Sequence, residues 1–519
     1  MALWDFLNLY YSRAKKMSFW NFLNYWYGQA KTMSFWNFLN YWHRQAKRMS
    51  DTYKDVEFNL EVVTGEHDQV LFLEAGSDFA DVLISFLTLP LGTIVRVLNQ
   101  HYCGDDDKEA PPTIGSLTSL YNGLENLDSC HFWTESCKEM LLNPRSSFEG
   151  ECLKLKLDIN GTTRPTKYFC CEDFDCVYPR HSNISMHRDA ATCTCGKSLK
   201  REIGTMDSSS DGDGGIFTVK NGSFLISGDM VLVPNINVAG SVMETLSNLA
   251  ITDNDGTEQW KMTFGVNDIV IMLEDLLIPE TESAAIETEP GNLFHEADSN
   301  SKKMNLRLTV QKSTNKLLFA QSEEDFVDFL FSLLTVPLGG VAFLLGGNTS
   351  LTKLDNLYQS VENINEDKYL SNPDIKNRLI NPKLRNGYMS KNQILPLTEE
   401  NGPRMYYNLD LNLGKEWLSY SGRDPVIEFR NGHRHGSYLK EPTMYMVSDD
   451  LIVTPLTMTS SLSILTELKI PLSDVEEVEV QIGLKEGLSI LKASLTSTTA
   501  LTDGLMVDSM FKKQPKQVD

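Results

Sequence analysis

The chain has 519 residues, of which 41% are hydrophobic and 23% are charged, a balance typical of a globular protein long enough for several domains. Its formal net charge is −23 at pH 7. A protein this acidic repels phosphate backbones, so we do not expect it to bind nucleic acid.

Residues 1–50 form a repetitive basic head. Three sixteen-residue units occupy 1–16, 17–32 and 33–48, and each places apolar or aromatic residues at i, i+3, i+4 and i+7. This spacing predicts three short amphipathic helices. Seven basic residues and one acidic residue give the head a charge of +6, which leaves −29 for the rest of the chain. Basic, Trp-rich amphipathic helices favour peripheral contact with an anionic membrane, or with a protein partner.

Two other interpretations of the head stay open. One is a recent duplication without a function, and the other is a cleavable organelle-targeting segment, although Ser and Arg are scarce for such a segment. Asn, Gln, Lys and Arg are spread through residues 1–50, so no apolar core of the signal-peptide type occurs there. We therefore expect a cytoplasmic protein that carries no secretory signal.

The first α+β domain is expected over residues 51–277. Alternating apolar residues at 58–62 and an apolar run at 70–76 predict a β-hairpin. Apolar residues at i, i+3, i+4 and i+7 over 79–86 predict a helix with one buried face. The sequence LPLG at 89–92 predicts a break and then a second short helix, because proline lacks an amide donor.

A second copy of this pattern is expected over residues 304–510. Residues 70–98 correspond to 317–345 at an offset of 247 residues, and a later segment, 224–234, returns at an offset of 221. A closing strand and helix end the copy, with the helix predicted at 484–495.

Three further segments belong to the second half of the chain. Residues 278–303 are acidic and rich in Thr, Ser and Pro, which predicts a linker, and 511–519 form a short tail. Residues 326–347 are apolar and long enough to span a membrane. Their internal Pro-Leu-Gly break, and charged residues in the matching part of the first copy, instead favour two buried helices.

A cysteine-rich segment at 168–197 distinguishes the first copy from the second. The offset between matching motifs falls from 252 residues before this segment to 221 after it, so the first copy carries 31 extra residues. The segment contains two close pairs, which are Cys171 with Cys176 and Cys193 with Cys195. Two such pairs on short loops are typical of a tetrahedral four-thiolate site, so the sequence predicts a structural zinc ion.

Alternatives to this ligand set stay open. Cys170 could replace Cys171, and His181 or His187 could replace a thiol. The cysteines could also be free thiols, or one of them a redox or catalytic thiol. A catalytic zinc ion needs an open coordination position, and four cysteines argue against one.

No sequence motif marks an active site. The nucleophile elbow, the Walker loop and the dinucleotide-binding fingerprint are all absent. Acidic residues recur at equivalent positions of the two copies, and helix capping or turn formation is the simplest explanation for them. These acidic pairs are Asp78 with Asp325, Asp81 with Asp328, Glu125 with Glu362 and Asp229 with Asp450.

Several motifs carry a family resemblance. They include LYNGLENLD at 120–128, LLNPR at 141–145, CTCGKSLKREI at 193–203 and MVSDDLIVTP at 446–455. With them the chain resembles, over about 55–510 and in two copies, a plant family known as domain of unknown function 674. The resemblance implies a plant protein and no established activity. The head lies outside the family pattern, and the second copy lacks the cysteines.

These observations together predict an α+β fold with two tandem related α+β domains, the first of which carries a Cys-rich, zinc-ribbon-like insertion. The expected function is a non-enzymatic binding or scaffold protein with a structural zinc site and a protein partner. The alternative is an enzyme of unknown class, with a site between or within the repeated domains.

Overall fold

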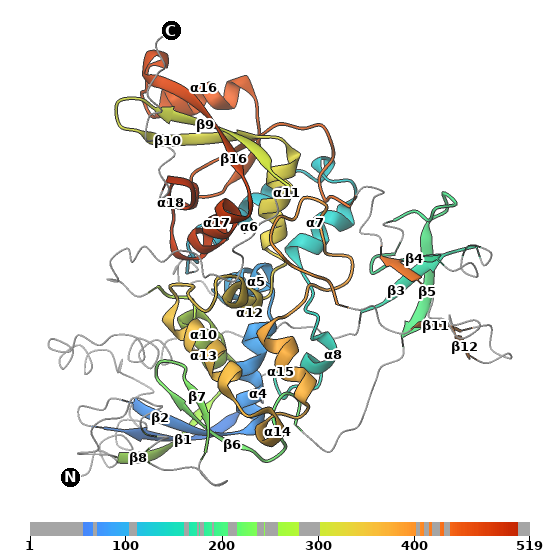
Figure 1. The fold of residues 1–519 in the computed structure, drawn as a ribbon, viewed down its shortest axis with the longest axis vertical. Helices are drawn as coiled ribbons and strands as arrows, with labels where there is room; N and C mark the ends of the chain where they lie inside the picture. The colour runs from blue at the N-terminus through green and yellow to red at the C-terminus, as the bar shows by residue number, and fades with distance from the viewer. Residues whose placement is uncertain are drawn as a thin grey trace, which may run out of the picture.

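Three β-sheets and the helices between them make up the structure, which is a computed structural model (Figure 1). Our predictions for the head, and for nearly all of the acidic linker, lie outside the described residues. The structure describes residues 56–65, 70–102, 112–159, 166–173, 176, 181–188, 191–205, 215–235, 243, 246, 258–279, 302–400, 405–408, 415–417, 426–429 and 436–506.

The first sheet contains the predicted hairpin. β1 (Phe58–Thr64) pairs antiparallel with β2 (Val70–Gly76). β8 (Glu258–Phe264) lies on the other side of β1, and β6 (Ser223–Ser227) and β7 (Leu232–Pro234) continue the sheet beyond β2. The strand order is therefore β7-β6-β2-β1-β8. Burial alternates along β1, as expected of a strand with one face on the core.

The second sheet has the same arrangement. The hairpin of β9 (Met304–Gln311) and β10 (Lys316–Ser322) lies at its centre. β14 (Tyr445–Val447) and β15 (Val453–Pro455) follow on one side, and β16 (Val475–Ile482) pairs with β9 on the other. The order β15-β14-β10-β9-β16 matches the first sheet strand for strand.

A helix, a break and a second helix follow the first hairpin, as predicted. α4 (Ser77–Ser85) runs into a 3-10 turn, η3 (Phe86–Thr88). α5 (Leu91–Tyr102) begins directly after Pro90. Nearly every side chain of α4 and η3 is buried in the core, where α4 packs against β2 and β6 and η3 packs against α12 (Leu338–Leu344).

The same sequence of elements follows the second hairpin. α11 (Glu324–Leu333) and α12 (Leu338–Leu344) are separated by Pro337 and are almost wholly buried. The apolar stretch at 326–347 thus forms two short core helices, as expected. Within the described residues, no helix combines the length and the apolar character that crossing a membrane requires.

The two Pro-Leu-Gly breaks lie against each other in an isolated antiparallel bridge. The Leu91 N–H donates to the Val336 carbonyl at 3.0 Å, and the Leu338 N–H donates to the Leu89 carbonyl at 2.9 Å. The two bonds are equivalent, because Leu89 and Leu91 of the first half correspond to Val336 and Leu338 of the second half at the offset of 247 residues. The breaks therefore pair backbone groups that the prolines leave outside the helices.

Helices from each half of the chain pack beside the sheet of the other half. α6 (Leu117–Asn126) packs against β15 and α11, whereas α13 (Thr352–Asn363) packs against β7. The Leu232 N–H, in β7, donates to the Ser360 hydroxyl in α13 at 3.0 Å. One hydrophobic core consequently continues through both halves. The predicted domain boundaries stay a prediction.

The closing helix is present where the sequence predicts it. α17 (Leu484–Thr496) follows β16, and α10 (Val266–Asp275) follows β8 in the same way. α16 (Met458–Glu467) covers a second, smaller core on the second sheet. The remaining helical elements are η4 (Ser129–His131), α7 (Glu135–Leu142), α8 (Glu149–Cys152), α14 (Glu366–Tyr369), α15 (Pro373–Ile380), η7 (Leu472–Asp474) and α18 (Ala500–Met506).

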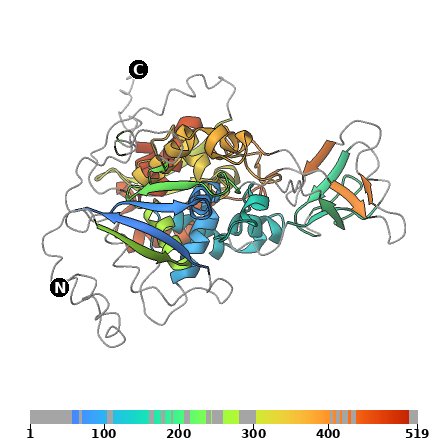
Figure 2. The same cartoon turned by 90° about the horizontal axis from the view of Figure 1, so that it is seen from below.

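The third sheet projects from the rest of the molecule, and we call it the arm (Figure 2). Its order is β12-β11-β5-β3-β4-β13, so three adjacent strands of the first half lie between strands of the second half. β4 and β13 pair in parallel, and the other pairs are antiparallel. The strands are β3 (Tyr168–Cys171), β4 (His181–Ser185), β5 (Leu199–Thr205), β11 (Met405–Asn408), β12 (Lys415–Trp417) and β13 (Val426–Phe429). The mixed α+β class is confirmed, and the arm takes in the predicted cysteine-rich insertion.

Candidate metal centre

One of the two cysteine pairs sits on a tight turn in the arm. The Cys193 N–H donates to the Lys197 carbonyl at 2.8 Å, and the Gly196 N–H donates to the Cys193 carbonyl at 2.9 Å. Gly196 has φ +86°, a left-handed conformation that glycine adopts without a steric penalty. This turn holds Cys193 and Cys195 two residues apart at one end of the sheet.

The other pair lies where β3 ends. The pairing of β3 with β5 shifts register between Cys170 and Cys171, and both side chains are buried. Two residues further on, the chain turns, and the Cys176 N–H donates to the Asp173 carbonyl at 3.3 Å. The register shift and the turn bring Cys171 and Cys176 to the Cys193 loop.

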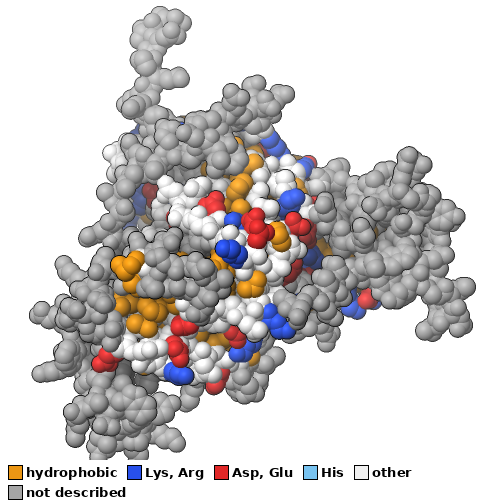
Figure 3. Space-filling model, turned by 60° about the horizontal axis from the view of Figure 1, so that its bottom comes forward, with side chains coloured by type: hydrophobic (Ala, Val, Ile, Leu, Met, Phe, Trp, Pro, Cys, Tyr) orange, Lys and Arg blue, Asp and Glu red, His pale blue; other side chains and the backbone are white. Residues whose placement is uncertain are grey.

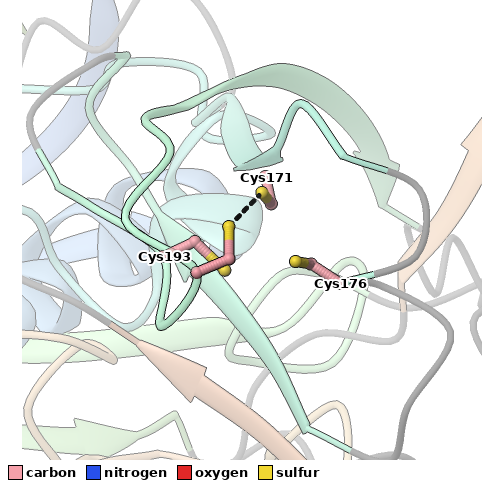
Figure 4. A group of neighbouring side chains, drawn as sticks. Cys171, Cys176 and Cys193 are labelled. Atoms are coloured by element: carbon pink, nitrogen blue, oxygen red, sulfur yellow. Dashed lines mark hydrogen bonds between the residues drawn. The ribbon is translucent and has the colours of Figure 1, made fainter.

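The four predicted ligands form one cluster. The Sγ atoms of Cys171, Cys176, Cys193 and Cys195 all lie within 4.8 Å of one another. The shortest contact recorded, 3.5 Å, joins the Sγ atoms of Cys171 and Cys195 and is the dashed line in Figure 4. Zinc–sulfur bonds of about 2.3 Å in a tetrahedron separate the sulfurs by about 3.8 Å. The cluster is therefore close to the size that such an ion requires, and these contacts are too long for disulfides.

Burial and hydrogen bonds shift the pKa values of the clustered thiols in different directions. Burial raises the pKa of Cys171, and a hydrogen bond with the Cys195 thiol raises the pKa of Cys176 to about 11. Burial also opposes ionisation of Cys193, but hydrogen bonds from the Cys195 backbone and the Thr194 hydroxyl outweigh it and lower that pKa to about 7. Four thiolates cannot coexist without a cation, and a divalent metal ion would ionise all of them.

The structure distinguishes among the alternative ligands. Cys170 is not in the cluster, and its thiol donates to the Cys171 carbonyl at 3.6 Å. His187 lies instead near Arg145, and burial together with that positive charge lowers its pKa to about 4. The side chain of His181 lies outside the described residues. Among the described side chains, the cluster consists of the four predicted cysteines.

An ionic network at the root of the arm is a feature that the sequence did not indicate. Glu149, which is 4% exposed, accepts from Arg145 at 2.9 Å, from Arg385 at 3.2 Å and from the Thr166 hydroxyl. Arg385 also donates to the Tyr168 hydroxyl at 2.6 Å. Thr166 and Tyr168 begin the arm, so this network anchors it to the body. Its partners lie up to 236 residues apart, which conceals the network in the sequence.

The shared acids Asp81 and Asp328 have a structural role different from the one expected. Asp81 accepts the backbone N–H groups of residues 216–218 at 2.7–3.2 Å. Asp328 accepts the Tyr438 N–H at 2.6 Å and the Leu439 N–H at 3.2 Å. Burial raises the pKa of both carboxyls, to about 6 for Asp328. Helix capping is therefore the wrong explanation for this pair, whose members each hold a distant loop from within a helix.

The pair Asp78 and Asp325 agrees better with the expected role. Each lies in the first turn of its helix and accepts the N–H of the next residue, at 2.9 Å and 2.7 Å. Glu125 and Glu362 are exposed on their helices. Asp450 accepts from the Ser448 hydroxyl in a turn, also as expected. The shared acids are thus spread over separate structural roles.

The fold and the cluster define a mixed α+β protein with a four-cysteine candidate metal centre. The chain belongs to the family described as "Protein of unknown function (DUF674)", which matches residues 54–485. This match takes in the arm and all strands of the two five-stranded sheets, and it begins after the head. Comparison with curated proteins and with solved structures finds no match.

Proposed function

We propose that the protein is a non-enzymatic binding or scaffold protein whose arm is held together by a structural zinc ion. The ligands are Cys171, Cys176, Cys193 and Cys195. The observation that carries the proposal is the gathering of all four sulfur atoms within 4.8 Å, from two loops that are separated in the sequence.

Zinc fits this donor set better than other common ions. Four thiolates in a small tetrahedron suit zinc or an iron–sulfur centre, whereas calcium and magnesium prefer oxygen ligands. Four protein ligands fill the coordination sphere of zinc and leave no position for a substrate. The ion would therefore contribute folding free energy rather than catalysis.

The arm is the part of the fold that needs such an ion. Its described residues contribute few large apolar side chains to the core, among them Phe169, Ile184 and Leu199, whereas most of that core lies on the two five-stranded sheets and their helices. A small sheet with so little apolar burial gains stability from a metal ion. The ion also bears on the second half of the chain, because β11 pairs with β5 and β13 pairs with β4.

Support for a binding role comes from the shape and charge of the molecule. The arm projects away from the body, and β12 and β13 are the outermost of its described strands, a position at which an extended peptide can add to a sheet. Acidic and basic side chains are interspersed on the described part of the face that Figure 3 shows. Together with the net charge of −23, this mixture favours a protein partner over nucleic acid.

We also propose that the two halves are related copies, because their sheets share one strand order and the contacts of Asp81 resemble those of Asp328. Reduced thiols fit the cytoplasm, which keeps cysteines free for metal ions. The family resemblance supports a plant origin for the protein.

The head is proposed to add a second contact, with a membrane surface or with the partner, because it is basic and amphipathic in sequence. Flotation of the full chain with anionic liposomes at low salt tests the membrane contact. We expect binding that high salt weakens. Failure to float at low salt would remove the membrane contact and leave the protein partner.

Metal analysis of the purified full chain tests the zinc site. We expect about one zinc ion per chain, and loss of that zinc in Cys176→Ser and Cys193→Ser. Zinc content that is unchanged by both substitutions, or an absence of zinc from the wild type, contradicts the proposal. Cys130→Ser is the matched control, because Cys130 is exposed and lies outside the cluster.

The binding role needs its own comparison. Affinity capture from plant tissue with the wild type, with Cys176→Ser and with residues 1–50 removed separates binding through the arm from binding through the head. We expect the principal partner to be lost with Cys176→Ser. A set of partners that no change affects contradicts a role for the arm.

A further inference from the structure

The four clustered thiols differ in their access to solvent. Cys171 and Cys193 are 2% and 1% exposed, Cys176 is half-buried, and Cys195 is exposed. A dissolved oxidant therefore meets Cys195 first. The other three sulfurs are less exposed and lie within 4.8 Å of it, close enough to react with the product that forms there.

Cys195 also has a partner in position for a disulfide. Its Sγ lies 3.5 Å from the Sγ of Cys171, and a disulfide bond of about 2.05 Å requires the two atoms to approach by about 1.5 Å. Cys195 sits on the turn that contains Gly196, whereas Cys171 belongs to strand β3. We expect the turn to supply this movement, because the strand is fixed by its neighbours.

Cys193 is less suited to this reaction than Cys171. The Asn183 side-chain amide donates to the Sγ of Cys193 at 3.6 Å, and the Thr194 hydroxyl lies 3.8 Å from the same sulfur. These contacts, with its burial, hold Cys193 in place and shield it. The pair of one exposed and one adjacent buried thiol is therefore Cys195 with Cys171.

We infer that the zinc centre is a peroxide-sensitive switch, in which oxidation joins Cys171 to Cys195 and releases the metal ion. This inference rests on the proposed zinc site. The Cys195 thiolate attacks one oxygen of hydrogen peroxide, the O–O bond breaks, and the departing hydroxide takes a proton to become water. The sulfur then carries a hydroxyl group as a sulfenic acid.

The second step forms the disulfide. The Cys171 thiolate attacks the Cys195 sulfur, the S–O bond breaks, and the hydroxide that leaves takes a proton to form a second water. Two electrons pass from the sulfur pair to the peroxide. Zinc then keeps two of its four thiolates and dissociates, because two ligands bind it far more weakly than four.

Release of zinc acts on both halves of the chain. β3 ends at Cys171, and it pairs with β5, which in turn pairs with β11 from the second half. The disulfide replaces the ion as the link between the β3 end and the turn, and loss of the ion frees Cys176 and Cys193 from that link. The oxidised arm is therefore a different binding surface from the zinc-bound arm, and a thiol reductant with zinc restores the original.

The experiment treats zinc-loaded full-length protein with hydrogen peroxide and follows released zinc with a zinc-responsive dye. Peptide mapping then identifies the disulfides. We expect release of about one zinc ion per chain and a Cys171–Cys195 disulfide, both reversed by dithiothreitol and zinc. Cys130→Ser is the control and behaves as the wild type, since that cysteine lies outside the cluster.

A Cys195→His variant sharpens the test. Histidine is a zinc ligand, but it cannot form a disulfide. We therefore expect peroxide to release zinc from this variant roughly tenfold more slowly than from the wild type. Retention of zinc by the wild type in peroxide, or a disulfide that excludes Cys195, overturns the switch. Purified wild type without zinc overturns the zinc site itself, before peroxide is added, so the two failures are distinguishable.

Discussion

The arm and the two five-stranded sheets are stabilised by different forces. Each five-stranded sheet places one face on a core of buried Leu, Val, Ile and Phe side chains that continues through both halves. The arm contributes few large side chains to this core, among them Phe169, Ile184 and Leu199, and it also holds the four clustered thiols, with the Glu149 network at its root. If the proposed ion is bound, the chain relies on burial where it builds two layers and adds ligand and ionic contacts where it builds one.

Removal of the proposed metal ion is expected to produce the largest difference in stability between the arm and the five-stranded sheets. Structural zinc sites contribute apparent binding free energies of about 10–16 kcal/mol, which a chelator withdraws from the region that they hold. We predict that strong chelation lowers amide protection in β3, β5 and β11 roughly 100-fold or more, and leaves β1 and β9 protected. Hydrogen exchange with mass spectrometry measures both regions in one sample.

Addition of zinc should restore protection in the arm, and magnesium serves as the control ion because it prefers oxygen ligands. Equal loss of protection in the arm and in the five-stranded sheets contradicts the division into two regions. Full protection of the arm after chelation contradicts a stabilising metal ion.

Asp328→Ala tests whether the body depends on one buried carboxylate. The substitution leaves the N–H groups of Tyr438 and Leu439 without their acceptor in a buried site. We predict a loss of about 3–5 kcal/mol in the free energy of unfolding, measured by urea denaturation. Asp325→Ala, three residues earlier in the same helix, is the matched control and should cost about 0.5–1 kcal/mol. Similar losses for both variants contradict the anchoring role.

The same carboxyl group predicts a pH dependence. Burial raises the pKa of Asp328 from 3.8 to about 6, and it outweighs the hydrogen bonds that the carboxylate accepts. Because the folded chain holds this proton more tightly, the stabilisation is complete below pH 3.8 and is lost as pH rises through 6. The unfolding free energy of the wild type, relative to Asp328→Asn, should therefore fall by about 2 kcal/mol from pH 4 to pH 7. A difference that stays constant over this range contradicts the shifted pKa.

The smallest effect is expected on the outer face of the second sheet. Arg307 pairs with Glu479 at 3.0 Å, and the two side chains are 48% and 79% exposed. Water screens such a pair, so Arg307→Gln should change the free energy of unfolding by about 0.5 kcal/mol or less. A loss above about 2 kcal/mol by urea denaturation contradicts the view that apolar burial stabilises this sheet.

Local patterns in the sequence predicted most elements of the two five-stranded regions. The alternation at 58–62, the helical spacing from Phe79 and the Pro-Leu-Gly breaks all describe contacts within a few residues, and the structure confirms them. The four cysteines of the cluster were predictable because their pairs are close in sequence. Cys171 was preferred over Cys170 without a local signal, because the difference between them depends on a register shift in the pairing with β5.

Long-range contacts could not be predicted in the same way. The pairing of β11 with β5 and the packing of α6 beside β15 join residues far apart, and no local signal records them. Asp81 and Asp328 did carry a signal, since each is an acid on the buried stripe of an apolar helix. An acid in that position is expected to accept backbone N–H groups in the core. We had explained the shared acids by helix capping or turn formation, and so did not predict this role.

X-ray absorption at the zinc edge of the purified full chain tests the central claim most directly. The account predicts about four sulfur ligands at about 2.3 Å, and loss of this signal in Cys193→Ser. A first shell of nitrogen or oxygen atoms, or a sample without zinc, would contradict a four-thiolate centre that holds the arm.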